Sequence, residues 1–328
     1  MLENVVYYHT APYRIKKVHS ILEYTPKNAY ACIRYLYCAI CGSDYSFYCG
    51  RRTSYPLSLG HEFVGQIISL GKGCQGFEIG DYVISDFNYR CGKCKYCKSG
   101  MSHLCQQNNK QDFSNRGFAH YGHVHLSYLV KMSNLQKTWH GCLSEPLSCV
   151  MHASAVAGIT PDMNILIFGG GGIGMLFCFY LTRVIQCANV DIKEKNIEKL
   201  SRIENRFNVN LNHKKAYDLI IDCTNEPDGT ELALFNVNRG GKICIMSHLY
   251  GLDTSFIYEE CCRREISPIF PLRNGEKKNL EDACRLVSKH WDLNDDLLLH
   301  HYSDVSLAFA MKNRDAGCKQ IIQLDEMC

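Results

Sequence analysis

The apolar positions of the chain follow different patterns in its two main parts. Up to about residue 148, short β-leaning runs such as Asn4–Tyr8 and Ala29–Tyr35 are separated by polar turns. Glycine, proline and aspartate recur between these runs, which is typical of a β-rich domain with tight connections. From about Cys149, short apolar runs alternate with helical stretches, which is typical of a doubly wound parallel sheet.

The apolar runs predict individual elements. The expected strands of the parallel sheet are Ile165–Phe168, Ala188–Asp191, Asp218–Asp222 and Lys242–Met246. After about Pro271 the pattern changes again and predicts a helix at Asn279–Lys289 and a last strand at Lys319–Leu324. We therefore expect an α/β protein with a β-rich region over 1–148, a parallel-sheet domain over 149–270 and a third segment over 271–328.

A glycine-rich turn follows the first of these strands. Gly169, Gly171 and Gly174 have the G-x-G-x-x-G spacing, which lets a pyrophosphate approach the backbone and the positive end of the next helix. Asp191 lies about 20 residues after the first glycine, where a carboxylate holds the ribose hydroxyls of a dinucleotide. The alternative is a glycine turn of another α/β protein, in which Asp191 only caps a helix.

The expected dinucleotide is NAD, because a carboxylate repels the 2′-phosphate of NADP. Lys193 weakens that preference slightly. The expected cofactor-binding residues are Gly169, Gly171, Gly172, Ile173, Gly174, Asp191 and Lys193.

Length, charge and cysteine content narrow the class of protein. A chain of 328 residues can hold two domains, and its net charge of +3 is too small to predict binding to nucleic acid or to an anionic membrane. The 20 cysteines occur in a long chain whose first residues form no secretory signal. We therefore expect reduced thiols in a cytoplasmic protein, some of them metal ligands. No apolar run is long enough to span a membrane.

One segment, over about residues 90–106, concentrates four cysteines with the spacing C-x2-C-x2-C-x7-C. They are Cys91, Cys94, Cys97 and Cys105. Four thiolates with lysines between them can close a tetrahedral zinc site that has no open position. An iron–sulfur cluster and a zinc ribbon that binds nucleic acid are the alternatives. Neither of them explains the sheet pattern downstream.

A second set of metal-ligand types is spread along the chain. Cys41 precedes Gly42-Ser43-Asp44, His61 and Glu62 follow Gly60, and Glu145 lies much later. One thiolate, one imidazole and one carboxylate leave an open position on zinc, as catalysis requires. Each residue alone has an ordinary structural explanation, and only their joint occurrence favours a catalytic metal site.

With these residues in place, the chain resembles the zinc-dependent medium-chain dehydrogenases, and Glu145-Pro146-Leu147 is most similar to the polyol (sorbitol) dehydrogenase branch. The resemblance implies a GroES-like β domain interrupted by a Rossmann domain. It also implies two zinc ions per chain, NAD, and oxidation of a secondary alcohol such as a polyol or sugar derivative. Ligands of the catalytic zinc would be Cys41 and His61 with Glu62 or Glu145, whereas Cys91, Cys94, Cys97 and Cys105 would hold the structural zinc.

The resemblance assigns further roles. Ser43 would pass the alcohol proton toward solvent, and a histidine that many relatives use in that relay is replaced by Ser46. Arg51, Arg52 and Arg273 are candidate substrate contacts, since arginine can hold a phosphate or carboxylate. A sugar phosphate or an acidic sugar is therefore an alternative to a free polyol, and solvated surface arginines are the structural alternative.

The sequence also allows two other classes of protein. One is a zinc-free quinone oxidoreductase of the same fold, and the other is a non-catalytic protein that binds NAD and zinc. A homodimer or homotetramer is expected, joined through an edge of the Rossmann sheet near Lys242–His248 or Ser267–Phe270.

Overall fold

The computed structural model describes residues 1–107, 117–132, 138–211, 216–247, 254–290, 299–312 and 317–324. The chain divides into two compact units. The first contains Met1–Ser148, Arg273–Asp315 and Lys319–Cys328, and the second contains Cys149–Leu272 and Ala316–Cys318. Within the described residues, no helix is both long and apolar enough to cross a membrane.

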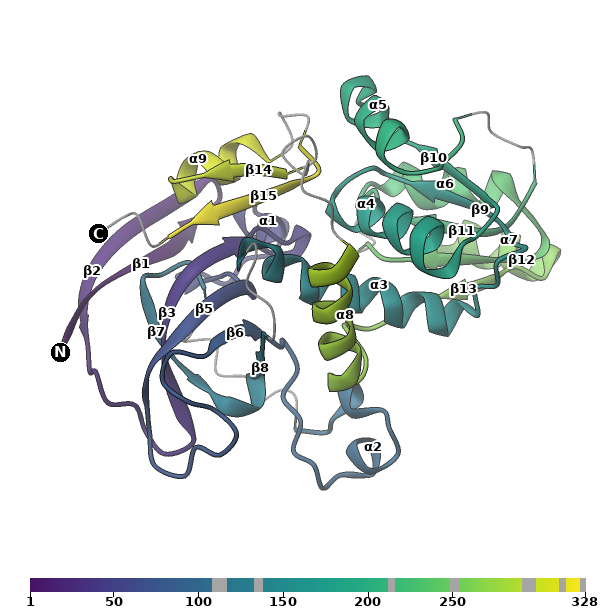
Figure 1. The fold of residues 1–328 in the computed structure, drawn as a ribbon. Helices are drawn as coiled ribbons and strands as arrows, with labels where there is room; N and C mark the ends of the chain where they lie inside the picture. The colour runs from purple at the N-terminus through teal and green to yellow at the C-terminus, as the bar shows by residue number, and fades with distance from the viewer. Residues whose placement is uncertain are drawn as a thin grey trace. The chain divides into compact units, whose positions relative to one another are not determined.

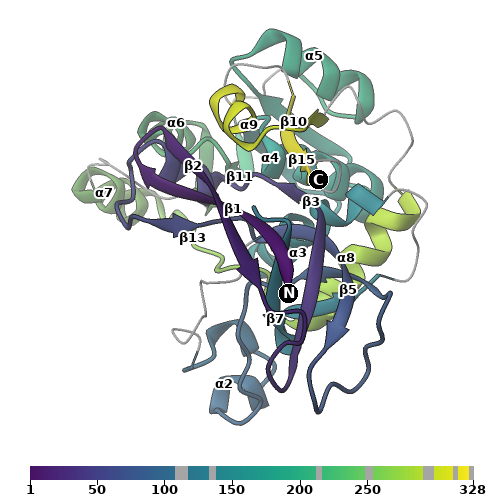
Figure 2. The ribbon, with the colours of Figure 1, turned by 90° about the vertical axis from the view of Figure 1, so that its left-hand side faces the viewer.

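The first unit is built from two sheets. Strands β2, β1 and β4 form a small antiparallel sheet, and the β1–β2 hairpin lies at the front of Figure 2. The larger sheet has the order β14-β15-β3-β5-β6-β8, and β7 also pairs with β3. The strands of this unit are β1 (Leu2–Ala11), β2 (Arg14–Leu22), β3 (Tyr30–Ala39), β4 (Leu57–Ser58), β5 (Glu62–Leu70), β6 (Tyr82–Ser85), β7 (Tyr121–His125), β8 (Leu129–Lys131), β14 (Leu299–Tyr302) and β15 (Lys319–Gln323).

Strand β3 is the centre of this unit. It is bordered by β5, β7 and β15, and its residues Ile33 and Tyr35 are buried in the core. Consecutive residues of β3 are buried, so its apolar and polar positions do not alternate strictly as they do in a half-exposed strand. The helices here are α1 (Gly42–Tyr48), α2 (Lys95–Lys98), α3 (Ser144–Ala157), α8 (Lys277–His290) and α9 (Val305–Met311), with 3-10 turns η1 (Ser102–Leu104), η3 (Leu126–Tyr128) and η4 (Thr138–Leu143). Helix α3 continues into the second unit.

The second unit is a five-stranded parallel sheet in the order β10-β9-β11-β12-β13, and helices pack against it (Figure 1). Four apolar residues of β9, Ile165–Phe168, are buried, as the centre of such a sheet requires. Its elements are β9 (Asn164–Phe168), α4 (Gly172–Phe179), the π-helix η5 (Tyr180–Ile185), β10 (Asn189–Lys193), α5 (Ile197–Arg206), β11 (Tyr217–Asp222), α6 (Pro227–Asn236), β12 (Val237–Ile245), α7 (Thr254–Arg264) and β13 (Ser267–Ile269).

The structure confirms the predicted α/β class and places a strand or helix at each segment predicted from the apolar pattern. One expectation about the sheet edge is wrong: β12, which contains Lys242, pairs with β11 on one side and with β13 on the other. Of the two segments considered for self-association, only Ser267–Ile269 lies at an edge of this sheet. Residues 248–253 lie outside the described part of the chain.

Candidate functional site

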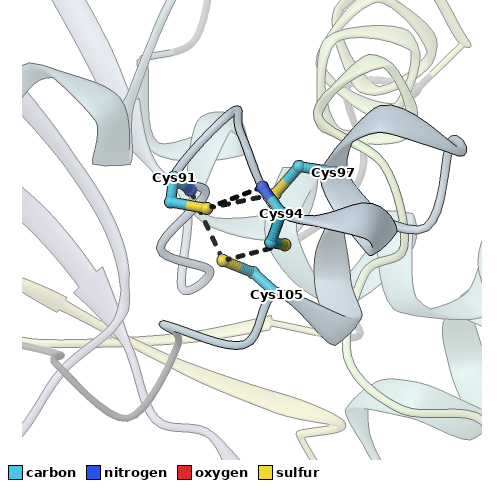
Figure 3. A group of neighbouring side chains, drawn as sticks. All are labelled: Cys91, Cys94, Cys97 and Cys105. Atoms are coloured by element: carbon cyan, nitrogen blue, oxygen red, sulfur yellow. Dashed lines mark hydrogen bonds between the residues drawn. The ribbon is translucent and has the colours of Figure 1, made fainter.

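The four cysteines of the predicted lobe converge (Figure 3). Their sulfur atoms all lie within 4.8 Å of one another. The Sγ atoms of Cys91 and Cys97 are 3.9 Å apart, and those of Cys94 and Cys105 are 4.0 Å apart. A tetrahedron with zinc–sulfur bonds of about 2.3 Å has edges of about 3.8 Å, so the four thiols fit one zinc ion. A disulfide needs about 2.05 Å and does not fit.

Backbone groups of the lobe prepare its thiols for a metal. The amides of Cys91 and Gln107 each lie 3.4 Å from the Cys105 sulfur, and hydrogen bonds from the amides of Cys97 and Gln106 lower the pKa of Cys94 to about 6. Burial instead raises the pKa of Cys97 to about 12. Four thiolates packed this closely repel one another, and a bound dication relieves that repulsion.

The second group of ligand types is brought together by the pairing of β3 with β5. In this antiparallel pair Ala39 lies opposite Glu62, so Cys41, which follows β3, lies beside the start of β5. One ligand atom each of Cys41, His61 and Glu62 lies within 4.8 Å of the others. His61 and Glu62 are buried, and Cys41 is half-buried. Among the described residues, Glu145 does not join this group, although it is also buried.

Charged neighbours hold His61 in place. Asp44 Oδ1 lies 3.4 Å from His61 Nδ1, and Asp44 Oδ2 accepts a 3.1 Å hydrogen bond from the Cys41 amide. Burial favours neutral His61, but Asp44 and the Cys41 thiolate outweigh burial, so the pKa of His61 is well above its usual value. A carboxylate behind a metal-ligating histidine fixes the orientation of its ring.

Glu62 has a different partner. Its Oε2 forms an ion pair with the buried ammonium of Lys319, at the start of β15. The Lys319 ammonium is the partner of Oε2, whereas within the described residues no hydrogen-bond donor lies on Oε1. Buried carboxylates are normally satisfied, so an oxygen left without a donor beside a thiol and an imidazole suits a cation. The donor set Cys, His and Glu therefore fits a zinc ion with an open position.

The sequence offered only weak signals for three supporting residues. Asp44 lies three residues after Cys41, at the spacing of a helix capping box, and Lys319 begins a strand that also contains two glutamines. The Phe87 ring packs against His61 at a tilt of 46°, with ring centroids 4.7 Å apart, and the Arg273 guanidinium lies 5.4 Å from the Phe87 centroid. Of the candidate substrate arginines, Arg273 is thus linked to His61 through one ring.

The other candidate residues of the first unit lie on helix α1 or shortly after it. Ser43 is half-buried in the first turn of α1, and Ser46 Oγ donates a 3.0 Å hydrogen bond to the Gly42 carbonyl. Arg51 is exposed, and the Arg52 guanidinium lies 5.5 Å from the ring centroid of Phe47.

A buried polar network connects Phe87 with the cysteine lobe. Arg90, next to Cys91, forms an ion pair with Asp86 and donates to Ser102 Oγ at 2.8 Å and to the Gly275 carbonyl at 3.0 Å. Asn274 donates to Asp86 at 3.1 Å and accepts from Asn88, and both asparagines are fully buried. Because Phe87 lies between Asp86 and Asn88 in sequence, the network holds its backbone on both sides.

In the second unit, the glycine turn has the geometry that its sequence predicts. Gly169 has a φ of +93°, which favours glycine. A Cβ added to Gly174 would lie 1.8 Å from the Gly169 carbonyl oxygen, so no side chain fits there. A Cβ added to Gly171 would meet nothing within 4 Å. Gly172 and Ile173 form the first turn of α4. The turn is therefore closely packed on the sheet and open where a phosphate would approach.

Asp191 is buried in the middle of β10, two residues before the end of that strand. Its carboxylate is only 1% exposed and accepts hydrogen bonds from Tyr217 Oη at 2.7 Å and from Asn210 Nδ2 at 3.3 Å. At the end of β10, Lys193 is exposed and its ammonium lies 5.6 Å from the ring centroid of Phe168. The residue beside the glycine turn is Glu194, whose Oε2 accepts a 2.6 Å hydrogen bond from the Gly170 amide.

Comparison with known proteins gives a consistent family. Residues 27–134 match the alcohol dehydrogenase GroES-like domain. A sorbitol dehydrogenase of Halalkalibacterium halodurans is 38% identical over 314 residues, covering 86% of this chain and 87% of that protein. A sorbitol dehydrogenase of Bacillus subtilis is 26% identical over 294 residues, with 80% and 82% covered.

Solved structures share the fold. An alcohol dehydrogenase from Escherichia coli CFT073, complexed with NADH, superposes with a TM-score of 0.84 at 20% identity, covering 98% of this chain and 99% of that one. Galactitol-1-phosphate dehydrogenase from Escherichia coli gives 0.84 at 21% identity, with 98% and 100% covered. Both identities are low, so these two structures support the fold, and the family rests on the sequence relatives. The chain therefore belongs to the zinc-dependent medium-chain alcohol dehydrogenase superfamily, on its sorbitol dehydrogenase-like branch.

Proposed function

We propose that this dehydrogenase oxidises a secondary alcohol of a polyol or sugar derivative, reversibly, with zinc held by Cys41, His61 and Glu62 and with NAD. The observation that carries the proposal is the convergence of these three residues, whose ligand atoms lie within 4.8 Å of one another. A half-buried thiol, a buried imidazole and a buried carboxylate, with no fourth protein ligand in the group among the described residues, are suited to a catalytic rather than a structural metal. We propose a second, structural zinc on Cys91, Cys94, Cys97 and Cys105.

Each side chain has a definable task. Bound zinc supplies a Lewis acid that lowers the pKa of an alcohol, and the nicotinamide supplies the hydride acceptor. Asp44 orients His61 and favours the tautomer with its proton on Nδ1, so that Nε2 keeps its lone pair. Ser43, two residues after Cys41 and half-buried, can carry the alcohol proton toward solvent. Ser46 already donates its proton to a helix carbonyl and is not needed for that relay.

Glu62 is the carboxylate ligand that we favour over Glu145. Glu62 belongs to the three-residue group, whereas Glu145 acts on the charges around that group. Its negative charge favours protonated Lys319 and the charged form of Arg273, although burial opposes both. Glu145 then balances one buried cation, Lys319, and one half-buried cation, Arg273.

A neutral substrate fits Arg273 better than an anion does. The Arg273 guanidinium already donates to Asn88 Oδ1 at 3.1 Å, lies over Phe87 and interacts with the charges of Glu145 and Asp86. A cation with two carboxylates around it has little charge left for a phosphate. We therefore place a free polyol ahead of a sugar phosphate or an acidic sugar.

One experiment tests the proposal. Zinc-loaded protein is assayed for NADH production on a panel of polyols, their phosphate esters and sugar acids, and its metal content is measured in parallel. We expect about two zinc ions per chain and the highest kcat/KM on a free polyol. One zinc per chain with no turnover on any alcohol would leave only the structural site, and faster turnover of the phosphate esters would reverse the order of substrates.

A further inference from the structure

The carboxylate of Glu194 lies directly on the glycine turn. Its Oε2 accepts from the Gly170 amide at 2.6 Å, and its Oε1 accepts from the Asn196 amide at 2.9 Å. The pairing of β9 with β10 continues to this point, because the Gly169 amide donates to the Lys193 carbonyl at 2.8 Å. Glu194 is therefore fixed beside the turn by sheet pairing and by two backbone hydrogen bonds.

Asp191 is held at a different level of the sheet. Asp191 pairs with Leu166 in the middle of β9. It lies three residues before Glu194, and three residues span about 10 Å along a strand. Its carboxylate is buried and accepts from Tyr217 and Asn210. A ligand seated on the glycine turn could reach Asp191 only if the sheet opened and these bonds broke.

We propose that Glu194, and not Asp191, is the acidic residue that accepts the hydroxyls of the adenosine ribose and thereby selects NAD over NADP. This inference rests on the proposed NAD-dependent function. A carboxylate at the end of the second strand, beside the glycine turn, is where a dinucleotide fold reads the ribose. A carboxylate offers about four acceptor positions and the backbone uses two of them, so each oxygen can accept a ribose hydroxyl.

The surroundings of Glu194 agree with this role. Glu194 is half-buried, so it is accessible to a ligand, whereas Asp191 is not. The neighbouring Lys193 directs its ammonium over the Phe168 ring, at 5.6 Å from the centroid. A phosphate on the ribose 2′ position would then meet the Glu194 carboxylate, and the repulsion disfavours NADP. Asp191 supports the sheet through Tyr217.

The test compares cofactor binding without turnover. NADH and NADPH are titrated into the full-length, zinc-loaded protein in the absence of alcohol, and nicotinamide fluorescence or calorimetry gives each Kd. The variants are E194Q, E194A, D191N and the control E198Q. Glu198 is an exposed glutamate on α5 that pairs with Arg202, so E198Q removes the same charge a short distance away. Circular dichroism and the thermal midpoint verify that each variant is folded.

We expect E194A to raise the Kd of NADH about 10-fold or more, because bonds to a charged acceptor are lost. E194Q keeps the shape but not the charge, and should shift the NADH-to-NADPH preference about 10-fold toward NADPH. D191N should lower the thermal midpoint and change the Kd of NADH by less than about threefold. A threefold change corresponds to less binding free energy than one hydrogen bond to a charged group contributes. E198Q should match wild type.

Results that contradict the Glu194 inference differ from results that contradict the proposed function. If D191N loses NADH affinity while E194Q keeps the wild-type preference, Asp191 reads the ribose and this inference is wrong. If E194A does not fold, an unchanged preference in E194Q is sufficient to overturn it. If the wild-type protein binds neither NADH nor NADPH, the proposed function itself fails, and the inference fails with it.

Discussion

The two groups of metal-ligand residues in the first unit are built in different ways. The cysteine lobe takes four identical ligands from residues 91–105, in a segment with short helices and little core. The other group takes three different ligands from two separate strand ends and lies among buried charges, including Asp44 and Lys319. A metal in the first group would be held by its four ligands alone, whereas the second group depends on the sheet and on charge balance.

This contrast agrees with the proposed roles of the two groups, a stabilising metal site and a catalytic one. Four thiolates complete the coordination of zinc and leave no position for substrate. Three ligands leave one position, and the charged neighbours then determine how strongly the metal polarises a ligand. The buried network around Arg90 joins the lobe to Phe87, and Phe87 packs against His61, so the two groups are structurally connected.

The largest expected effects come from removing one cysteine from each group. C41S should lose about 10³-fold or more in kcat/KM, because metal polarisation contributes several kcal/mol and each 1.4 kcal/mol is tenfold. It should retain one metal per chain. C94S should also lose one metal, with a larger fall in thermal midpoint, because structural zinc contributes directly to folding. Metal analysis, turnover and thermal unfolding measure these effects.

The contrast between the two groups would break down if the two variants behaved alike. A C41S protein that keeps both metals and full turnover would remove Cys41 from the catalytic site. A C94S protein as stable as wild type would show that the lobe needs no metal to hold its structure.

A somewhat smaller effect is expected from the buried ion pair of Glu62. K319M leaves the Glu62 carboxylate buried without its cation, and such a loss costs roughly 3–5 kcal/mol in the free energy of unfolding. Zinc supplies a second positive charge, so the cost should be greatest after a chelator has removed the metal. Urea unfolding with and without chelator measures this difference.

The matched variants for this test are K319R and K93M. K319R keeps the charge and should recover part of the stability. Lys93 is an exposed lysine of the cysteine lobe, and K93M should stay within about 0.5 kcal/mol of wild type. If K319M and K93M lost equal free energy of unfolding, burial of charge would not distinguish the Glu62 group from the cysteine lobe.

The smallest of these effects concerns His9, a buried histidine in the same core. Among the described residues, neither ring nitrogen has a hydrogen-bond partner, and the ring packs against Phe309 with centroids 4.8 Å apart. Burial lowers the pKa of His9 to about 4 from 6.5, although the charge of Asp44 opposes this. As pH falls from 6.5 to 4, the unfolded chain binds a proton that the folded chain does not, so the folded state loses stability.

Replacing His9 with phenylalanine removes that linkage. Wild type should lose about 2 kcal/mol more than H9F between pH 7 and pH 5, as measured by urea unfolding. Parallel losses in the two proteins would show that His9 is protonated in the folded state. In that case burial would not determine the protonation of this histidine.

The local pattern of the sequence was sufficient for much of the fold. The apolar runs predicted β9, β11 and β15, since each contains a short apolar run next to polar residues. The same pattern could not predict strand order. It treated Lys242 as part of an edge strand, but β12 pairs on both sides, and pairing between distant strands leaves little mark on the spacing of either one.

By itself, the sequence determined the cysteine lobe and the glycine turn, because a few adjacent residues fix both the geometry and the chemistry of such motifs. Only the tertiary structure decided that Glu62 and not Glu145 lies with Cys41 and His61, and that Glu194 and not Asp191 lies beside Gly170. In each case two carboxylates of the same chemistry compete for one role. The choice depends on strand register, which fixes where along the sheet each side chain lies and which charges surround it.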